Sequence, residues 1–396
     1  MASNGIRDKV AVVGMGCTRF GERWDAGVDE MLVDAATEAL DSAGMSLGDI
    51  DAFWLGTVGN YSGLTLSKPL KIDNKPVTRV ENFCATGSEA LRNASYAVAS
   101  GAYDVVMAIG VEKLKDSGYS GLVLATGWTD GTEAELTAPA MFSLLAPAYS
   151  GKYGVDMDTL KDVFTHIAWK NHRNGALNPR AQFRREVPKE VIKASPPIAG
   201  MLGIFDASGV SDGSAAAVIV RAEDAPRYQE KPLYVKALSF VAGAGKGPID
   251  PGYDYTTFTE VVASAEDAYS QAGVTDPRAE LAFAEVHDCF TPTEMVLMED
   301  LGFAPRGTAW KEVLAGTFDL DGTLPINPDG GLKSFGHPLG ASGLRMLFEA
   351  WLQLRGDAGD RQIGNGRKLA LTHNLGGMPG AAVSFVSIWG SEPAAC

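Results

Sequence analysis

The feature that most constrains this chain is an internal repeat. Four short segments recur, in the same order, in the last third of the 396 residues. Both members of a pair have the same helix-like or strand-like pattern, and four ordered pairs make chance similarity of Ala/Gly-rich segments the weaker interpretation. The pairs are 35–44 with 264–273, 84–91 with 340–347, 103–110 with 367–374, and 213–220 with 380–387. The repeat predicts two similar α/β halves.

The spacing of these pairs locates an insertion. The offset rises from 229 to 264 over the first three pairs and falls to 167 at the fourth. The first copy therefore carries close to a hundred additional residues between Gly110 and Gly213. The predicted units are an N-terminal half of residues 1–110 plus 212–225, an inserted loop domain of residues 111–211, and a C-terminal half of residues 226–396.

The strand-like segments are almost continuously apolar, as in KVAVVGMG, DVVMAIG and AAVIV. Strands with this composition are buried on both faces, so helices must cover the sheet on both sides. Two such halves packed side by side predict a five-layered αβαβα body.

Charge and cysteine content exclude several functions. The formal net charge of −15 argues against nucleic acid or an anionic membrane as the main partner. No stretch reaches the roughly 20 apolar residues of a membrane span, and the first residues lack the apolar core of a signal peptide. Four scattered cysteines without CxxC spacing predict neither a zinc site nor a disulfide framework. We expect a cytoplasmic protein with no bound metal.

A basic run, residues 170–193, lies in the predicted insertion of this acidic chain. It is interpreted either as a solvated charged face or as a surface for phosphates. The phosphate-binding candidates are Lys170, Arg173, Arg180, Arg184 and Arg185.

The candidates for chemistry lie at predicted strand ends or in glycine-rich loops. Cys84 precedes a helix-like stretch, where the helix dipole favours a thiolate, but a nucleophilic thiol also needs a base. His287 or His337 can supply that base, and Cys289 a second proton-transfer group. Inert core cysteines and structural histidines are the alternative. The repeat favours chemistry, because it gives Cys84 and the loop of His337 equivalent strand-to-helix corners that can face one cleft.

Six motifs together resemble the thiolase superfamily over nearly the whole chain, most closely its sterol-carrier-protein-2-type and archaeal-type branch. They are NFCATGSEALRNASYAVASGAYDVVMAIGVEKL, KNHRNGALNPRAQF, SDGSAAAVIV, EVHDCFTPTEMVLMEDLG, GGLKSFGHPLGASG and LTHNLGG. The resemblance implies the thiolase fold, in which two βαβαβαββ halves form the five-layered body and a loop domain is inserted in the first half.

The resemblance also implies a role for each site residue. Cys84 would accept the acyl group. His337 would activate the Cys84 thiol and help to hold the thioester oxygen of the substrate. His287 would stand where many thiolases place an asparagine that positions an oxyanion-hole water. Cys289 would transfer the second proton. A second oxyanion hole would use the backbone N–H groups of Cys84 and Gly376.

One departure from ordinary thiolases bears on the reaction. Their acid/base cysteine comes from a C-terminal Cys-x-Gly motif, whereas this chain has HNLGG. The branch places the cysteine in HDCF, so two reactive thiols remain. A related branch performs retro-aldol cleavage of steroid side chains with tyrosines near these positions, and His287 and Cys289 argue against that reaction here.

The implied activity is that of an acyltransferase of the 3-oxoacyl-CoA thiolase (acetyl-CoA C-acyltransferase) type. Coenzyme A is a substrate and no cofactor is permanently bound. Thiolysis of a bulky degradative 3-oxoacyl-CoA is favoured, and Claisen condensation is the reverse reaction. A decarboxylating ketosynthase that uses Cys84, His287 and His337, a retro-aldolase and a non-catalytic subunit are the alternatives.

The resemblance further implies assembly with other chains. Thiolases pair through their N-terminal halves, which predicts a homodimer. A small companion with an OB fold and a zinc ribbon, of the DUF35 type, is also expected, and any zinc would belong to it. The acyl pocket would be shaped by the insertion, through residues 118–131 and 138–154.

Overall fold

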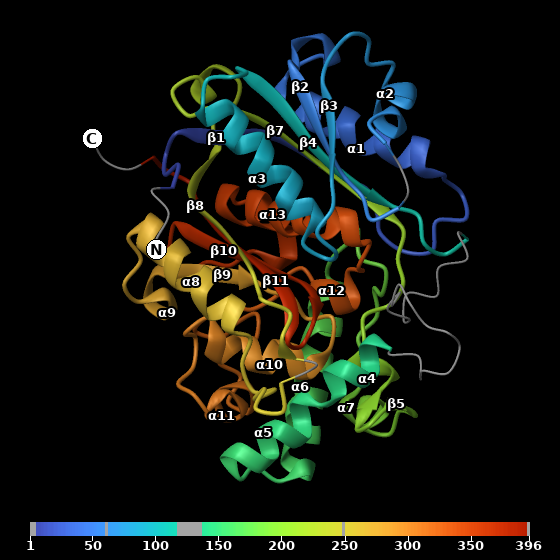
Figure 1. The fold of residues 1–396 in the computed structure, drawn as a ribbon, viewed down its shortest axis with the longest axis vertical. Helices are drawn as coiled ribbons and strands as arrows, with labels where there is room; N and C mark the ends of the chain where they lie inside the picture. Colours follow the sequence, from blue (N-terminus) through green and yellow to red (C-terminus); the bar gives the residue numbers. More distant parts are fainter. Residues whose placement is uncertain (1–4, 60–61, 117–136, 248–249, 394–396) are drawn as a thin grey trace.

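The computed structural model describes residues 5–59, 62–116, 137–247 and 250–393 (Figure 1). The predicted pocket segment 118–131 lies outside these residues. The strands are β1 (Val10–Cys17), β2 (Ala52–Gly56), β3 (Val77–Val80), β4 (Val105–Glu112), β5 (Pro197–Ala199), β6 (Leu202–Gly203), β7 (Gly213–Arg221), β8 (Leu233–Ala242), β9 (Leu281–Glu285), β10 (Leu369–Met378) and β11 (Ala381–Gly390). The helices are α1 (Val28–Ala43), α2 (Leu64–Leu70), α3 (Thr86–Ala99), α4 (Ala138–Ser143), α5 (Leu145–Tyr153), α6 (Met157–Ala176), α7 (Lys189–Lys193), α8 (Thr259–Ala272), α9 (Pro277–Glu280), α10 (Thr291–Asp300), α11 (Ala309–Leu314), α12 (Gly331–Ser334) and α13 (Leu339–Arg355).

The predicted repeat is present in the order and direction of the strands. Strands β2-β4-β7-β1 in the first half and β9-β10-β11-β8 in the second follow the same order. In each half the first pair is parallel and the next two pairs are antiparallel. The first half adds β3 beside β2, and a parallel bridge between Ala284 and Ile326 takes that place in the second half.

The two halves share one sheet, which the sequence did not predict. Strands β1 and β8 pair antiparallel over two residues, Ala11 with Tyr234 and Val12 with Leu233. This short contact joins the halves into nine strands in the order β3-β2-β4-β7-β1-β8-β11-β10-β9.

The two helices for which the sequence predicts an end at glycine do end there. Helix α1 stops at Gly44 and α8 at Gly273, both with a left-handed backbone (φ 64° and 71°) that glycine adopts without a steric penalty. Strands β1, β2 and β4 are buried along their whole length, as their apolar runs require.

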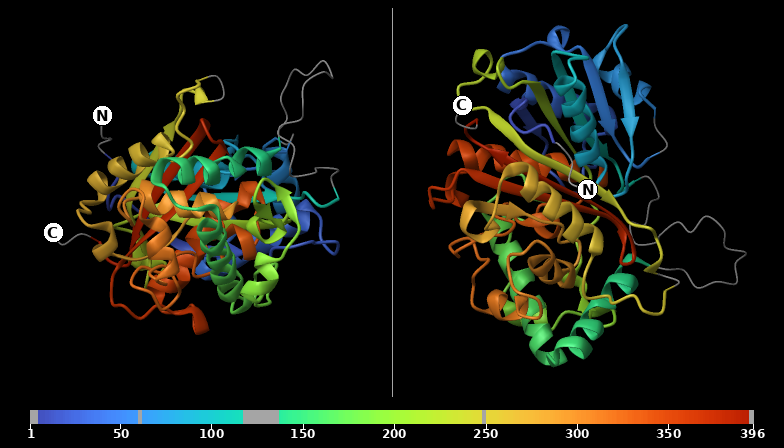
Figure 2. Two further views of the ribbon diagram at one scale, coloured as in Figure 1. Left: turned by 90° about the horizontal axis from the view of Figure 1, so that it is seen from below. Right: turned by 60° about the vertical axis from the view of Figure 1, so that its left-hand side comes forward.

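The layers follow from which faces these elements bury. Helix α1 covers the outer face of the first-half strands, and α8 and α10 cover the outer side of the second half. Helices α3 and α13 lie between the halves, where α13 contacts β4, β7 and β10 (Figures 1 and 2). The two halves of the joined sheet lie on either side of these middle helices and form the two β layers of the expected five-layered arrangement.

Backbone contact between glycines brings the middle helices together. A Cβ atom on Gly110 would lie 1.9 Å from the carbonyl oxygen of Gly340, and one on Gly87 would lie 2.5 Å from the same oxygen. Because no side chain separates them, the start of α13 reaches the end of β4 and the start of α3. The corner that carries Cys84 and the loop that carries His337 are thus held face to face.

The insertion lies where the offsets predicted it. Helices α4 to α7 and the β5–β6 hairpin occur between β4 and β7, whereas β10 and β11 are joined by a tight turn. The three domain boundaries given above remain predictions. Among the described residues, no helix has both the length and the apolar character needed to cross a bilayer.

Candidate active site

Cys84 lies in a tight turn between β3 and α3. Its neighbour Phe83 has φ 51°, a left-handed conformation that is uncommon for a bulky residue. Side chains hold this turn, because Glu81 accepts from the Phe83 N–H at 2.5 Å and the Thr86 hydroxyl donates to the Phe83 carbonyl at 2.6 Å. The turn leaves Cys84 half-buried at the start of a 14-residue helix.

His337 lies in the loop between α12 and α13, and two serines fix it. Its backbone N–H donates to Ser211 Oγ at 3.0 Å. Its Nδ1 lies 2.7 Å from Ser342 Oγ, and that hydroxyl donates to the Pro338 carbonyl at 2.9 Å. When the Ser342 hydroxyl proton points to the Pro338 carbonyl, the Ser342 oxygen accepts a hydrogen bond from Nδ1–H. The other ring nitrogen, Nε2, then carries the lone pair and can act as a base.

His287 and Cys289 follow β9 in the HDCF loop, which is tied to α12, the helix that precedes the loop of His337. The carboxylate of Asp288 accepts from the backbone N–H groups of Leu332 at 2.6 Å and Lys333 at 3.2 Å. The rings of His287 and His337 consequently meet edge to face, with 5.3 Å between their centroids. This clamp sets the spacing of the two imidazoles.

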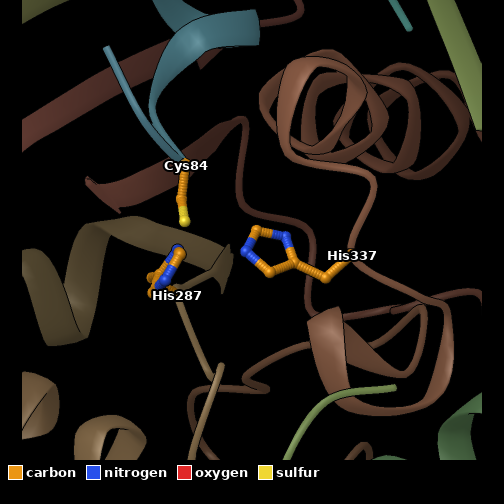
Figure 3. A group of neighbouring side chains, drawn as sticks. All are labelled: Cys84, His287 and His337. Atoms are coloured by element: carbon orange, nitrogen blue, oxygen red, sulfur yellow. The ribbon is translucent and has the colours of Figure 1, made fainter. Parts of the chain in front are cut away.

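The three side chains of Cys84, His287 and His337 point toward one another (Figure 3). The Cys84 sulfur and one nitrogen of each ring all lie within 4.8 Å of one another. One cavity exposes all three together with Cys289. Its wall is completed by Val58, Phe83, Leu114, Ala138, Phe142, Ser208, Gly209, Val210, Phe290, Leu339 and Gly377. The nucleophile, both imidazoles and the second thiol that the sequence predicted therefore share one cavity.

Two family models match this chain. The model described as "Thiolase, N-terminal domain" matches residues 10–223, and "Thiolase C-terminal domain-like" matches residues 249–388. The chain belongs to the thiolase family.

Curated relatives are similar over nearly the full chain. An acetyl-CoA acetyltransferase of Methanothermobacter thermautotrophicus is 36% identical, over 96% of this chain and 99% of its own length. One of Methanocaldococcus jannaschii is 34% identical, over 95% and 97%. Human sterol carrier protein 2 is 32% identical over 95% of this chain and 74% of its own. These relatives confirm the branch and identify the chain as a thiolase-type acyltransferase.

Two solved structures confirm the fold. "Ltp2-ChsH2(DUF35) aldolase" superposes with a TM-score of 0.83 at 23% identity, covering 98% of this chain and 99% of that one. "Structure of Acetyl-CoA acetyltransferase from Syntrophomonas wolfei" gives 0.71 at 19% identity, covering 98% and 100%.

Burial keeps the thiolase site uncharged at rest. Desolvation, and secondarily the nearby Glu112 carboxyl, raise the pKa of the Cys84 thiol to about 12. Desolvation lowers the pKa of His337 to about 3 and that of His287 well below its usual value. Desolvation, with the neighbouring Cys84 thiol next, raises the pKa of Cys289 well above its usual value. The resting pair is thus a thiol beside a neutral imidazole.

Glu112, at the end of β4, is a polar residue near the site that the sequence did not single out. Its carboxyl accepts from the Thr57 hydroxyl at 2.5 Å and from the Val58 N–H at 3.1 Å. Burial raises its pKa to about 7, so near neutral pH it is only partly charged. It fixes the backbone of Val58 in the cavity wall.

The same three donor atoms bear on metal binding. One thiol and two imidazoles are donor types that zinc accepts. The absence of a bound metal, expected from the scattered cysteines, remains a prediction.

The expected oxyanion-hole glycine lies next to the cavity. Gly376 packs so closely on the Cys84 turn that a Cβ atom there would lie 2.6 Å from the Asn82 carbonyl oxygen. Gly377, with φ 96°, is the glycine that lines the cavity. The assignment of Gly376 as a donor remains a prediction.

The structure separates the basic residues that the sequence grouped. Lys170 is 2% exposed, and its ammonium pairs with Glu294 at 3.0 Å. Arg180 pairs with Glu38 at 2.6 Å. Arg173 packs over the Trp169 ring, with its guanidinium 5.4 Å from the centroid. Arg184, whose guanidinium makes one long contact of 3.5 Å to Pro179 O, borders two surface cavities.

Ser342 and Lys333 are two residues of the GGLKSFGHPLGASG motif whose importance the sequence reasoning missed. Ser342 follows the histidine by five residues, just inside a predicted helix, where a short hydroxyl side chain often turns back on the preceding loop. Lys333 is a cation within a glycine-rich and otherwise weakly polar segment, which is an unusual place for a lysine.

Proposed function

We propose that this thiolase-family enzyme cleaves a 3-oxoacyl-CoA by CoA-dependent thiolysis through an acyl group on Cys84, and that the reverse reaction is a Claisen condensation. The observation that supports it is the single cavity shared by Cys84, His287, Cys289 and His337. A neutral His337 with a free Nε2 is the base that a neutral Cys84 thiol needs.

The first half-reaction begins as Nε2 of His337 takes the Cys84 proton. The thiolate adds to the 3-keto carbon, and the bond between C2 and C3 then breaks. The departing enolate takes the proton of Cys289 and leaves as a shorter acyl-CoA. The acyl group stays on Cys84 as a thioester. The protonated imidazole of His337, with His287, would donate to the thioester oxygen of the enolate.

In the second half-reaction, the thiol of free CoA gives its proton to the Cys289 thiolate. The CoA sulfur then attacks the acyl carbon on Cys84. Cys84 leaves as a thiolate and recovers its proton from His337, so both thiols are restored. Cys84, Cys289 and His337 therefore all return to their starting protonation states at the end of one cycle.

A mass measurement tests this proposal. The intact protein is exposed to a panel of acyl-CoAs and 3-oxoacyl-CoAs, and any adduct is mapped to a peptide. We expect an acyl group on Cys84 that added CoA removes, and none on the Cys84→Ala variant. If no substrate leaves an adduct, even with a companion subunit supplied, the acyl-enzyme mechanism is wrong.

Cys289 separates thiolysis from the ketosynthase alternative. Its place in the cavity supports proton transfer to the enolate, so Cys289→Ala should lose thiolysis while Cys84 can still be acylated. A decarboxylating ketosynthase would keep its activity in the same variant. Full retention of carbon–carbon bond chemistry would therefore favour that alternative.

We also propose a homodimer and a DUF35-type companion, as the resemblance implies. The name "Ltp2-ChsH2(DUF35) aldolase" shows that a structural neighbour was studied with such a partner. For the CoA phosphates, Arg184 and Arg185 are better placed than Lys170, whose charge is used inside the core. Light scattering of the chain alone and with a co-expressed companion measures both assemblies.

A further inference from the structure

A second cavity lies beside the catalytic one. Its volume is about 580 Å³, and residues 208–210 form part of the wall of both cavities. Much of its lining is apolar, including Phe183, Ile204 and Phe205. Two buried nitrogen-bearing side chains, Lys333 and His172, interrupt this apolar wall.

Lys333 is unusual among the buried cations of the described chain. Its side chain is 1% exposed, and the one hydrogen bond found for its ammonium runs to the Ala207 carbonyl at 3.2 Å. The other four buried cations each form an ion pair with a carboxylate: Lys170 with Glu294, Lys236 with Asp8, Arg345 with Glu285 and Asp329, and Arg361 with Glu349. No such pair joins Lys333 to a carboxylate of the described residues.

The acidic groups around Lys333 are already occupied. Asp206 pairs with Lys161 at 2.9 Å, and Glu294 pairs with Lys170. Asp288 accepts the two backbone N–H groups of the HDCF clamp, and burial raises its pKa to about 7. At neutral pH Asp288 is only partly charged, so the Lys333 ammonium is at most partly compensated within this group.

His172 adds a neutral polar atom to the same wall. It is 4% exposed, and its Nδ1 has no hydrogen-bond partner among the described residues. Burial, and then the charge of Lys333, lower its pKa to about 3, so it does not add a second positive charge. The remaining charged groups of the lining, Glu22 and Lys115, neutralise each other in an ion pair of 2.6 Å.

An isolated ammonium in an apolar wall is costly unless an anion compensates it. We propose that this side cavity binds a carboxylate at the far end of the acyl group, paired with the ammonium of Lys333. The preferred substrate class is then a 3-oxoacyl-CoA whose acyl chain ends in a carboxylate. This inference rests on the proposed function, because it names the substrate of the same site.

The charge balance favours a carboxylate over the two other groups that an acyl-CoA could place there. A CoA phosphate carries more charge than one ammonium can balance, and phosphate sites normally converge several cations. The amides of the pantetheine arm are neutral and would leave the ammonium uncompensated. A single carboxylate matches both the charge and the enclosed apolar surroundings.

Matched substrates test the proposal. Pairs of 3-oxoacyl-CoAs with six, eight and ten acyl carbons, ending either in a carboxylate or in a methyl group, are compared by kcat/KM. We expect the carboxylate member to be preferred. Lys333→Met should lower its kcat/KM about 30-fold or more and change the methyl member less than about threefold. Lys333→Arg keeps the charge and should retain part of the preference, and the exposed Lys193→Met serves as a control.

A binding measurement separates this inference from the proposed function. Calorimetry with Cys84→Ala protein and the corresponding saturated acyl-CoAs, with and without the terminal carboxylate, requires no turnover. A Lys333-dependent preference in binding without thiolysis of any substrate would refute the proposed function alone. An equal loss for both members of a pair in Lys333→Met, or no preference in the unaltered protein, would overturn the carboxylate site.

Discussion

In the proposed mechanism, the proton of Cys84 moves to His337 only during the reaction. Burial raises the pKa of Cys84 to about 12 and lowers that of His337 to about 3, so the resting pair is neutral. A raised thiol pKa means that the thiolate fraction is small at neutral pH and grows as the pH rises.

Alkylation of Cys84 by iodoacetamide should therefore accelerate about tenfold per pH unit between pH 7 and 10, because only the thiolate reacts. Peptide mapping by mass spectrometry follows the rate at this one residue. A rate that levels off below pH 8 would show a preformed thiolate–imidazolium pair and contradict the neutral resting state.

The tautomer of His337 depends on one hydroxyl. Ser342→Ala removes the acceptor that holds the proton on Nδ1, so part of the population would place it on Nε2 and lose the base. We expect kcat to fall about tenfold to a hundredfold with little change in KM. Nitrogen NMR shifts of His337 report the tautomer directly, and Ser342→Thr, which keeps the hydroxyl, should restore both readouts. Unchanged kcat in Ser342→Ala would exclude this role.

The sequence indicates which residues are candidates for the site better than it indicates whether a side chain is buried or exposed. Cys84, His287, Cys289 and His337 could be found because reactive groups at strand ends and glycine-rich loops are rarely needed for packing. The basic neighbours of Lys170 in the sequence predict a surface cation. Only the rotation of α6 against the second half decides that its side chain points into the core and meets Glu294.

At the scale of elements, the glycine contacts between the middle helices and β4 leave the least room for a side chain. A methyl group on Gly110 would lie 1.9 Å from the Gly340 carbonyl oxygen, and backbone must move to admit it. Gly110→Ala should lower the free energy of unfolding by about 1–3 kcal/mol and reduce activity, since the displaced start of α13 follows the loop of His337.

Gly151→Ala is the matched control, because this residue lies in α5 and a Cβ atom there meets nothing within 4 Å. That variant should be more stable by about 0.4–1 kcal/mol. Urea unfolding measures both. Equal stability of the two variants would show that the close approach is not a constraint.

Helices and strands could be predicted because their sequence patterns are local. The strand pairing that joins the two halves could not. Helix ends at glycine and buried apolar strands are written in neighbouring residues, which is why α1, α8 and β4 could be located. The pairing of β1 with β8 depends on two residues from each strand and on the geometry of both halves. No periodicity in either strand signals it.

At the scale of the whole molecule, buried ionisable groups set the response to pH. Four buried histidines are held neutral, because burial lowers their pKa, and they favour unfolding as the pH falls below about 6.5. Buried carboxyls with a raised pKa, such as Glu112, Asp288 and Asp300, hold protons in the folded state and oppose this effect. The two sets nearly cancel, so stability should vary little between pH 5 and 7.

At alkaline pH the contributions of the buried groups to the free energy of unfolding do not cancel. Burial raises the pKa of the thiols of Cys17, Cys84 and Cys289, so the unfolded chain loses these protons first as the pH rises through about 9. Their stabilisation is complete below the unfolded pKa and is lost above it, and the lowered pKa of Lys333 offsets only one of the three. Between about pH 9 and 10, before the unfolded chain also begins to lose the protons of buried tyrosines with a raised pKa, the free energy of unfolding should fall by about 2 kcal/mol per pH unit. Cys17→Ala removes one titrating thiol away from the catalytic cavity and should reduce this slope by about 1.4 kcal/mol per pH unit. Urea unfolding under reducing conditions measures both slopes, and identical slopes would show that the Cys17 thiol does not titrate on unfolding.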